Sequence, residues 1–203
     1  MKRLLSLALL ITLFYLPANN TAAQNSTLEL TLADGHEMVI DGTSNIRDWD
    51  ADVKTINATF KLADADFSDP SSLTADDFET MEFTIPVEDI ESGSGRLTKN
   101  IHKYLKGDDH PNIIFTLSDV ESVSTEDDEV MITARGVVNA AGVDNETTMN
   151  VEATLNADGT ITFAGSHGLK MTDFDIDPPT AMLGSIRARD EFDIVYNLTF
   201  RGQ

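Results

Sequence analysis

Apolar and polar residues alternate along most of this chain, beginning with Leu28, Leu30 and Leu32. Because successive side chains of a β-strand point to opposite faces, each alternating run predicts a strand with one apolar and one polar face. Similar runs follow near residues 55–62, 81–88, 113–117, 130–134, 149–155, 161–163 and 192–200. The pattern predicts an all-β chain whose antiparallel sheet has one apolar face and one face in water.

Short turn sequences separate the predicted strands, which number about eight or nine. Asn156-Ala-Asp-Gly159 and Asn139-Ala-Ala-Gly142 join neighbouring runs and carry residues that favour hairpins. Such strands close into a barrel or stack as a sandwich, because an open sheet would leave its apolar side and two edges exposed. The alternation leaves both architectures open. A barrel of about eight strands either fills its interior with side chains or holds one small ligand.

One segment, near residues 95–106, has helical rather than strand spacing. Its apolar residues recur every three or four positions, at Leu97, Ile101, Tyr104 and Leu105. Ser94 is in position to cap the start of a helix, and Gly107 is in position to end it. The spacing therefore predicts a single amphipathic helix inserted between two strands.

The N-terminal segment is not expected to belong to the fold. Lys2 and Arg3 precede a short apolar stretch that ends at Leu16, and small residues follow up to Ala23. This is the pattern of a bacterial secretory signal peptide, and an uncleaved anchor is the alternative. We predict that residues 1–23 are a signal peptide cleaved after about Ala23, that residues 24–203 form one domain, and that the protein is periplasmic or secreted.

Composition narrows the possible partners. The chain has 35 acidic and 14 basic residues, a formal net charge of −21 at pH 7, and no cysteine. Such an acidic chain repels nucleic-acid phosphates, so we expect no nucleic-acid partner. The lack of cysteine excludes disulfides, Cys-ligated zinc and cysteine nucleophiles. The sequence does not specify an oligomeric state.

The predicted helix is nevertheless basic, because it carries no acidic residue and has four basic ones: Arg96, Lys99, Lys103 and Lys106. One explanation is that these side chains neutralise acidic neighbours around the barrel rim, each exposed pair contributing at most about 1 kcal/mol. The other is that the helix contacts an anionic surface or a phosphate-bearing amphiphile. Both explanations require the apolar stripe of the helix to face the barrel.

No motif for catalysis or metal binding is present. The chain lacks a Gly-x-Ser-x-Gly sequence, a His-Glu-x-x-His sequence and a glycine-rich nucleotide loop. The four histidines, His36, His102, His110 and His167, form no pair with the spacing of a zinc site. We therefore expect no enzymatic activity, no catalytic residue and no metal site.

Three stretches of this sequence resemble the YceI-like family of exported bacterial barrels. The most specific is IPVEDIESG from Ile85 to Gly93, which is followed after the helix by LKGDDHPNIIF from Leu105 to Phe115. The others are GTSNIRDW, residues 42–49, and MTDFDIDPPTAMLG, residues 171–184. The resemblance covers nearly the whole chain after residue 23. It implies a lipocalin-like antiparallel β-barrel with one inserted helix, and a polyisoprenoid, isoprenoid quinone, prenyl lipid or similar amphiphile as ligand rather than a catalytic cofactor.

The leading hypothesis is a carrier that sequesters such an amphiphile, since burial of an apolar tail recovers about 0.8 kcal/mol per methylene. The candidate cavity or mouth residues are bulky and lie on inward strand faces or on the helix stripe: Trp49, Phe60, Phe83, Ile85, Leu97, Ile101, Tyr104, Phe115 and Phe163. Ordinary core packing is the alternative role for each of them. The second hypothesis is a ligand-free structural or stress-protective exported barrel.

Overall fold

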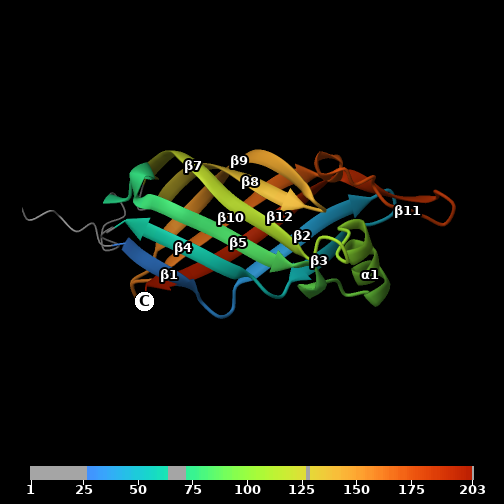
Figure 1. Cartoon of the computed structure of the whole chain (residues 1–203), viewed down its shortest axis with the longest axis horizontal. Helices are drawn as coiled ribbons and strands as arrows, with labels where there is room; N and C mark the ends of the chain where they lie inside the picture. The colour runs from blue at the N-terminus through green and yellow to red at the C-terminus, as the bar shows by residue number, and fades with distance from the viewer. Residues whose placement is uncertain (1–26, 64–71, 127–128, 203) are drawn as a thin grey trace, which may run out of the picture.

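The structure, a computed structural model, describes residues 27–63, 72–126 and 129–202, and most of these residues form strands (Figure 1). The strands are β1 Thr27–Leu32, β2 Glu37–Ser44, β3 Trp49–Val53, β4 Asn57–Ala63, β5 Phe78–Pro86, β6 Ile90–Glu91, β7 Asn112–Glu126, β8 Glu129–Ala140, β9 Val143–Leu155, β10 Ile161–Lys170, β11 Thr180–Ala181 and β12 Ile186–Gly202. The α-helix is α1, Gly95–Tyr104, and short 3-10 turns are η2 Ala75–Asp77, η3 Val87–Asp89 and η4 Met171–Phe174. The predicted signal peptide, residues 1–23, lies outside the described residues.

The sheet closes into a barrel. Antiparallel pairing connects β1, β4, β5, β7, β8, β9, β10 and β12 in that order. The last strand then returns to the first, with Leu30 opposite Gly202 and Leu32 opposite Phe200. This final pairing decides between the two architectures that the alternation leaves open, and it confirms the predicted eight-stranded antiparallel barrel.

At three of the eight positions around the barrel, two short strands lie end to end and together take the place of one long strand. β1 pairs with the last residues of β12, whereas β2 pairs with β12 from Ala188 to Asn197, so β1 and β2 lie along the same edge. In the same way β4 pairs with β1 while β3 pairs with β2. β5 pairs with β4 and β6 pairs with β3. The barrel is therefore longer than any of these short strands.

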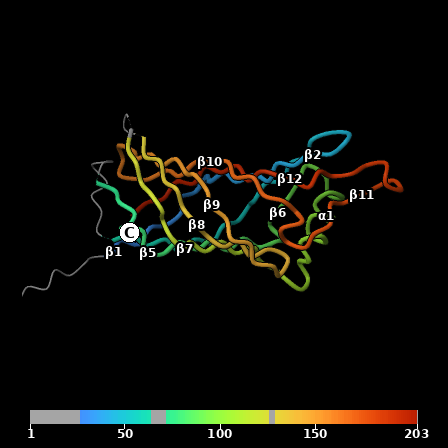
Figure 2. Tube along the Cα trace, turned by 90° about the horizontal axis from the view of Figure 1, so that it is seen from above, coloured from blue at the N-terminus to red at the C-terminus, as the bar shows by residue number. Residues whose placement is uncertain are grey.

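The two ends of the barrel differ. At one end, here called the mouth, lie α1 and the hairpin of β11 and β12; at the other, here called the base, lie the start of β1 and the C-terminus (Figures 1 and 2). Among the described residues, no helix has the length and apolar content that crossing a membrane requires.

Aromatic rings fill the base of the barrel. Phe60 and Phe200 are fully buried, and their ring centroids lie 5.3 Å apart. Phe163 contacts both rings, at 5.4 Å from Phe60 and 5.9 Å from Phe200. These residues occupy inward positions of different strands, so the alternation brings them together on the barrel axis.

A smaller apolar cluster closes the wall near the mouth. It is formed by Ala140, Ala141, Leu169, Met171, Phe174 and Ile176, and Trp49 and Tyr104 pack against it. η4 supplies two of these side chains, and Asp190 holds this turn by accepting hydrogen bonds from the Thr172 amide at 3.0 Å and the Thr172 hydroxyl at 2.7 Å. The cluster therefore fixes the segment between β10 and β11 against the barrel.

The predicted helix is confirmed, with α1 at Gly95–Tyr104; Ser94 occupies the N-cap position, but its side chain forms no capping hydrogen bond. Its C-terminus differs from the expected glycine stop, because Lys106 rather than Gly107 adopts the left-handed conformation, with φ of 55°. The Gly107 amide donates to the His102 carbonyl at 2.9 Å. A Cβ at Gly107 would lie 3.0 Å from Val87, so the glycine allows the turn to approach η3 closely.

Candidate ligand-binding cavity

A cavity of about 700 Å³ lies inside the barrel between the aromatic base and the mouth. Its wall is made by inward residues of the strands, among them Ile40, Met81, Phe83, Ile132, Val151 and Ile194. This volume falls within the range of about 300–1,000 Å³ that is usual for small-molecule sites. The interior of this barrel is therefore not filled by its own side chains.

Two glycines explain how large rings line the wall without filling the lumen. A Cβ at Gly136 of β8 would overlap the ring of Phe115 on the neighbouring strand β7. A Cβ at Gly165 of β10 would lie 2.7 Å from the hydroxyl of Tyr196 on β12. The missing side chains let both rings lie against the wall. Ala134, two positions from Gly136 on the inward face, adds to the free space.

Eight of the nine residues predicted from the sequence line this cavity: Trp49, Phe83, Ile85, Leu97, Ile101, Tyr104, Phe115 and Phe163. They come from β3, β5, α1, β7 and β10, so the fold brings together residues far apart in the chain. Their contact with a ligand stays a prediction.

Phe60 is the exception, because it does not line the cavity. It lies in the base, with its ring 6.2 Å from Phe78 as well as close to Phe163 and Phe200. The alternation places Phe60 correctly on the inward face of β4. Its position along the barrel axis, where rings from several strands meet, makes it a core residue.

The sequence reasoning also missed residues that line the cavity. Met38 and Ile40 of β2 belong to a short strand whose alternation is interrupted by Gly42. Leu169, Met171 and Phe174 line the cavity beside η4. The alternation within β2 could have identified Met38 and Ile40 as inward-facing. Residues 171–176 have neither strand nor helix periodicity, so the sequence pattern could not have identified the residues of that segment.

The titratable side chains of His167 and Tyr196, which line the cavity, are uncharged near neutral pH. His167 of β10 is half-buried, its Nε2 atom lies 2.7 Å from the hydroxyl of Thr147, and burial lowers its pKa below 6.5 despite the opposing effect of Asp193. Burial raises the pKa of Tyr196 to about 12. Both side chains are therefore neutral at pH 7, which suits an apolar occupant.

Helix α1 covers part of the mouth and is tied to the strand beside it. The Nε2 atom of His102 lies 2.8 Å from the carbonyl oxygen of Ile90 in β6, and the hydroxyl of Thr98 accepts a hydrogen bond from the amide of Ser92 at 3.0 Å. These contacts orient the helix so that Leu97, Ile101 and Tyr104 face the cavity.

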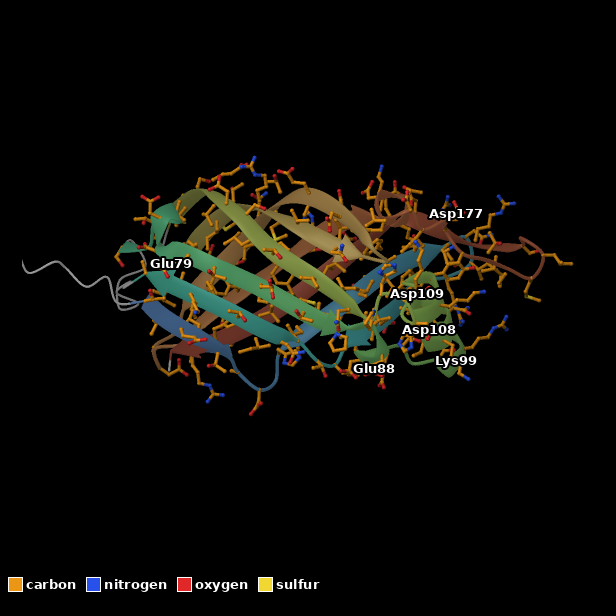
Figure 3. The ribbon with its side chains drawn as sticks, viewed as in Figure 1. Glu79, Glu88, Lys99, Asp108, Asp109 and Asp177 are labelled. Atoms are coloured by element: carbon orange, nitrogen blue, oxygen red, sulfur yellow. The ribbon has the colours of Figure 1, made fainter. Side chains whose placement is uncertain are left out.

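The mouth is lined by cations and not by acids. Arg47, Arg96 and Lys103 contribute to the cavity lining, and no Asp or Glu does so among the described residues. Acidic side chains also lie in the neighbourhood of α1, among them Glu88, Asp108 and Asp109 (Figure 3). The described residues nevertheless contain no ion pair that involves a basic residue of α1. Charge neutralisation at the rim, the first explanation for the basic helix, therefore finds no support in specific pairs.

The described residues contain no cluster of three or more His, Cys, Asp or Glu that is arranged to hold a metal ion. The arrangement is that of a binding site: a closed wall, an apolar interior, neutral polar groups and a basic entrance. Its chemistry can retain an apolar chain with a polar end.

A protein-family model for the YceI-like domain matches residues 24–200 of this chain. No curated protein matched the chain. Among solved structures, BcnA of Burkholderia cenocepacia is similar with a TM-score of 0.62 and 16% identity over 81% of this chain and 95% of BcnA. A polyisoprenoid-binding domain from Saccharophagus degradans, implicated in plant cell wall breakdown, has a TM-score of 0.65 and 9% identity over 87% of this chain and 99% of that domain. The YceI protein of Campylobacter jejuni has a TM-score of 0.55 and 18% identity over 75% of this chain and 84% of its own. At such identities these likenesses show the shared fold.

Proposed function

Because this chain belongs to the YceI-like domain family, we propose that its barrel is a carrier that holds one lipid-like amphiphile of the polyisoprenoid, isoprenoid-quinone or related class. The observation that carries this proposal is the apolar cavity of about 700 Å³ inside a closed barrel. The structurally similar domain of Saccharophagus degradans is itself described as polyisoprenoid-binding. Binding of this kind requires no catalytic group, and we propose that the protein is not an enzyme.

The energetics favour sequestration of an apolar tail. Each methylene moved from water into the cavity contributes about 0.8 kcal/mol, so a dozen carbons contribute about 10 kcal/mol. Association and ordering cost several kcal/mol, roughly 4–15 by different estimates. A dozen enclosed carbons therefore exceed the lower values of this cost, and the higher values require a longer enclosed tail. The neutral side chains of His167 and Tyr196 add no cost for desolvating a charge.

The orientation of the ligand follows from the difference between the two ends. The aromatic rings around Phe60 block the base, whereas the mouth is the end at which Arg47, Arg96 and Lys103 line the cavity. We therefore propose that the tail enters first and that the polar head group stays at the mouth. A head group with anionic oxygen atoms suits these three cations best.

A fluorescence titration tests the proposal, because Trp49 is the single tryptophan of the chain and lines the cavity. Protein freed of lipid by denaturation, extraction and refolding is titrated with geranylgeraniol and with a short-chain prenyl quinone. We expect a saturable change in Trp49 emission with one site per chain. An unchanged emission, together with no probe retained after gel filtration, would contradict the proposal.

A blocked-cavity variant distinguishes the lumen from the surface. Ala134→Trp places a large ring at a buried position that lines the cavity, and Ala164→Trp places the same ring on the outer face of β10. Both variants add a second tryptophan, so binding is measured by retained prenyl probe. We expect loss of retention in Ala134→Trp and parental retention in Ala164→Trp.

The proposed location is the bacterial periplasm or the medium, on the strength of the basic and apolar pattern of residues 1–23. N-terminal sequencing of the protein from its producing cells tests this directly. We expect the mature chain to begin at about Gln24. A chain that retains Lys2 and Arg3 would contradict cleavage.

A further inference from the structure

Two loops at the mouth display the most exposed large apolar side chains of the described residues. Ile46 is 62% exposed, Met182 is 71% exposed and Leu183 is 108% exposed. The other two exposed large apolar residues, Met131 and Val195, are only 42% and 40% exposed. Single exposed apolar residues are common on protein surfaces, but three of the most exposed ones in adjoining loops are unusual.

Hydrogen bonds hold these two loops together. The side-chain NH2 group of Asn45 donates to the Ser185 carbonyl at 2.9 Å, and the side-chain oxygen of Asn45 accepts from the backbone amide of Arg187 at 2.8 Å. The backbone amide of Asn45 donates to the Arg187 carbonyl at 3.0 Å. Residues 44–47 are thereby fixed against the hairpin of β11 and β12, so Ile46 and Leu183 belong to one projection, here called the mouth tip.

The backbone of the hairpin is arranged so that its tip carries side chains outward. Met182 and Leu183 have φ angles of 49° and 58°, in the left-handed region that residues other than glycine rarely adopt. Glycine or asparagine would occupy such positions at lower cost. In Figures 1 and 2 this hairpin extends beyond the rest of the barrel at the mouth. Two bulky apolar residues therefore stand at the turn of this hairpin, and Met182 also contributes to the lining of the cavity.

The projecting part of the mouth tip is basic, unlike the whole chain. Residues 42–47 and 178–189 contain Arg47, Arg187 and Arg189 and no acidic residue, whereas Asp41, Asp48, Asp177 and Asp190 border these two segments and the net charge of the chain is −21. All three arginines are exposed, and none forms an ion pair within the described part of the chain. An anionic surface would repel the body of the barrel and attract the tip, which orients the approach mouth first.

We propose that the mouth tip docks on the surface of an anionic lipid bilayer, with Met182, Leu183 and Ile46 inserted among the lipid chains and the arginines beside the head groups. Three separate projecting side chains fit a bilayer interface, where each can be buried by lipid. A stable protein interface needs about 800 Å² per partner with a packed core, which a narrow projection does not offer. The proposal rests on the proposed function for its purpose, because docking places the cavity mouth against the source of an amphiphilic ligand.

The test is sedimentation of purified protein with vesicles of phosphatidylethanolamine and phosphatidylglycerol, compared with vesicles of phosphatidylcholine. Parent and variants carry the same N-terminus. We expect the parent to bind the anionic vesicles more tightly. The double variant Met182→Ser with Leu183→Ser should lose at least tenfold in partitioning to them. Arg189→Gln should lose about fivefold on anionic vesicles alone.

Matched controls come from outside the mouth tip. Met131→Ser removes another exposed apolar side chain, and Arg201→Gln removes an exposed cation near the C-terminus. Both should bind as the parent does. The docking proposal is overturned if the parent does not bind, if the double variant binds equally well, or if Met131→Ser loses as much.

Two further measurements separate the competing outcomes. Sedimentation velocity reports whether the tip joins two copies of the chain, and a dimer that the double variant abolishes would overturn membrane docking in favour of self-association. The Trp49 titration with geranylgeraniol is carried out on the parent without vesicles. Ligand uptake without vesicle binding would remove the docking proposal alone, whereas vesicle binding without ligand uptake would remove the carrier function alone.

Discussion

Truncation of two inward-facing phenylalanines should have different consequences, because one lies in the packed base and the other lines the cavity. Phe60 is 0% exposed and its ring lies 5.3–6.2 Å from three other phenylalanine rings. Phe60→Ala removes this packing and leaves a new void, so we expect a loss of about 3–5 kcal/mol in the free energy of unfolding. For a domain of this size, a loss of about 4 kcal/mol lowers Tm by about 8–16 °C.

Phe83 has the same place in the alternating pattern but a different environment. Its ring lines the cavity, and its centroid lies 5.8 Å from that of Phe115 and 6.2 Å from that of Phe200. In Phe83→Ala the vacated space joins a cavity that already exists, so the energetic term for creating a void is largely absent. We expect a loss of about 1–2 kcal/mol, which reflects the buried part of the ring only.

Equilibrium unfolding in urea, with thermal unfolding as a second probe, measures both variants. Phe60→Leu and Phe83→Leu serve as milder controls and should preserve the order. Weaker binding of the prenyl probe is expected in Phe83→Ala, whose ring contributes to the cavity wall. Equal losses of stability for the two alanine variants would refute the reasoning, because they would mean that Phe83 is packed as tightly as Phe60 and that the lumen is closed.

Three further predictions concern the wall, the outer surface and the single cavity histidine. Gly136→Ala should push the Phe115 ring into the lumen and strain the pairing of β7 with β8, because the new Cβ would also lie 2.9 Å from the Thr116 carbonyl oxygen. Prenyl binding should weaken several-fold in the Trp49 titration, and unchanged affinity would contradict this. Asp41 lies opposite both Asp193 and Asp50 on neighbouring strands, where like charges repel one another. Asp41→Asn should therefore raise the free energy of unfolding by about 0.2–1 kcal/mol at low ionic strength, and added salt should reduce this gain. Burial lowers the pKa of His167 below 6.5 in the folded protein. Above pH 6.5 the imidazole is neutral in both the folded and the unfolded chain, so it does not change the free energy of unfolding. As the pH falls through 6.5, the unfolded chain takes up the proton first and the free energy of unfolding decreases. Urea unfolding between neutral and mildly acidic pH should therefore show a flatter profile for His167→Gln than for the parent, and parallel profiles would contradict this.

The alternation of apolar and polar residues carried most of the fold prediction. Long strands such as β8 and β9 have one apolar and one polar face over many residues, which makes their pattern unambiguous. The closure of the barrel was not predictable from the alternation, because it depends on the pairing of Leu30 and Leu32 with the opposite end of the chain. The end-to-end arrangement of β1 with β2, β3 with β4 and β5 with β6 was also not predictable, because the segments between these strands look like ordinary loops in the sequence.

The sequence predicted which residues face the barrel interior, but not how far along the barrel axis each of them lies. A period of two places Phe60 and Phe83 on the inward face, yet it carries no information on the position of a residue along the barrel axis. The helix was recognisable from Leu97, Ile101 and Tyr104, and the structure places all three at the cavity. The mouth tip was not recognisable, because Met182 and Leu183 lie in an irregular segment where apolar residues would ordinarily suggest burial.

Native mass spectrometry of the protein, purified without detergent from the cells that naturally produce it, tests the carrier function most directly. The account predicts a mass that exceeds the polypeptide by one stoichiometric adduct, which organic extraction releases as an apolar chain with a polar end. The Ala134→Trp variant from the same cells should lack the adduct. A bare polypeptide mass for the parent in repeated gentle preparations, with no uptake of added prenyl alcohols or quinones, would contradict the carrier function.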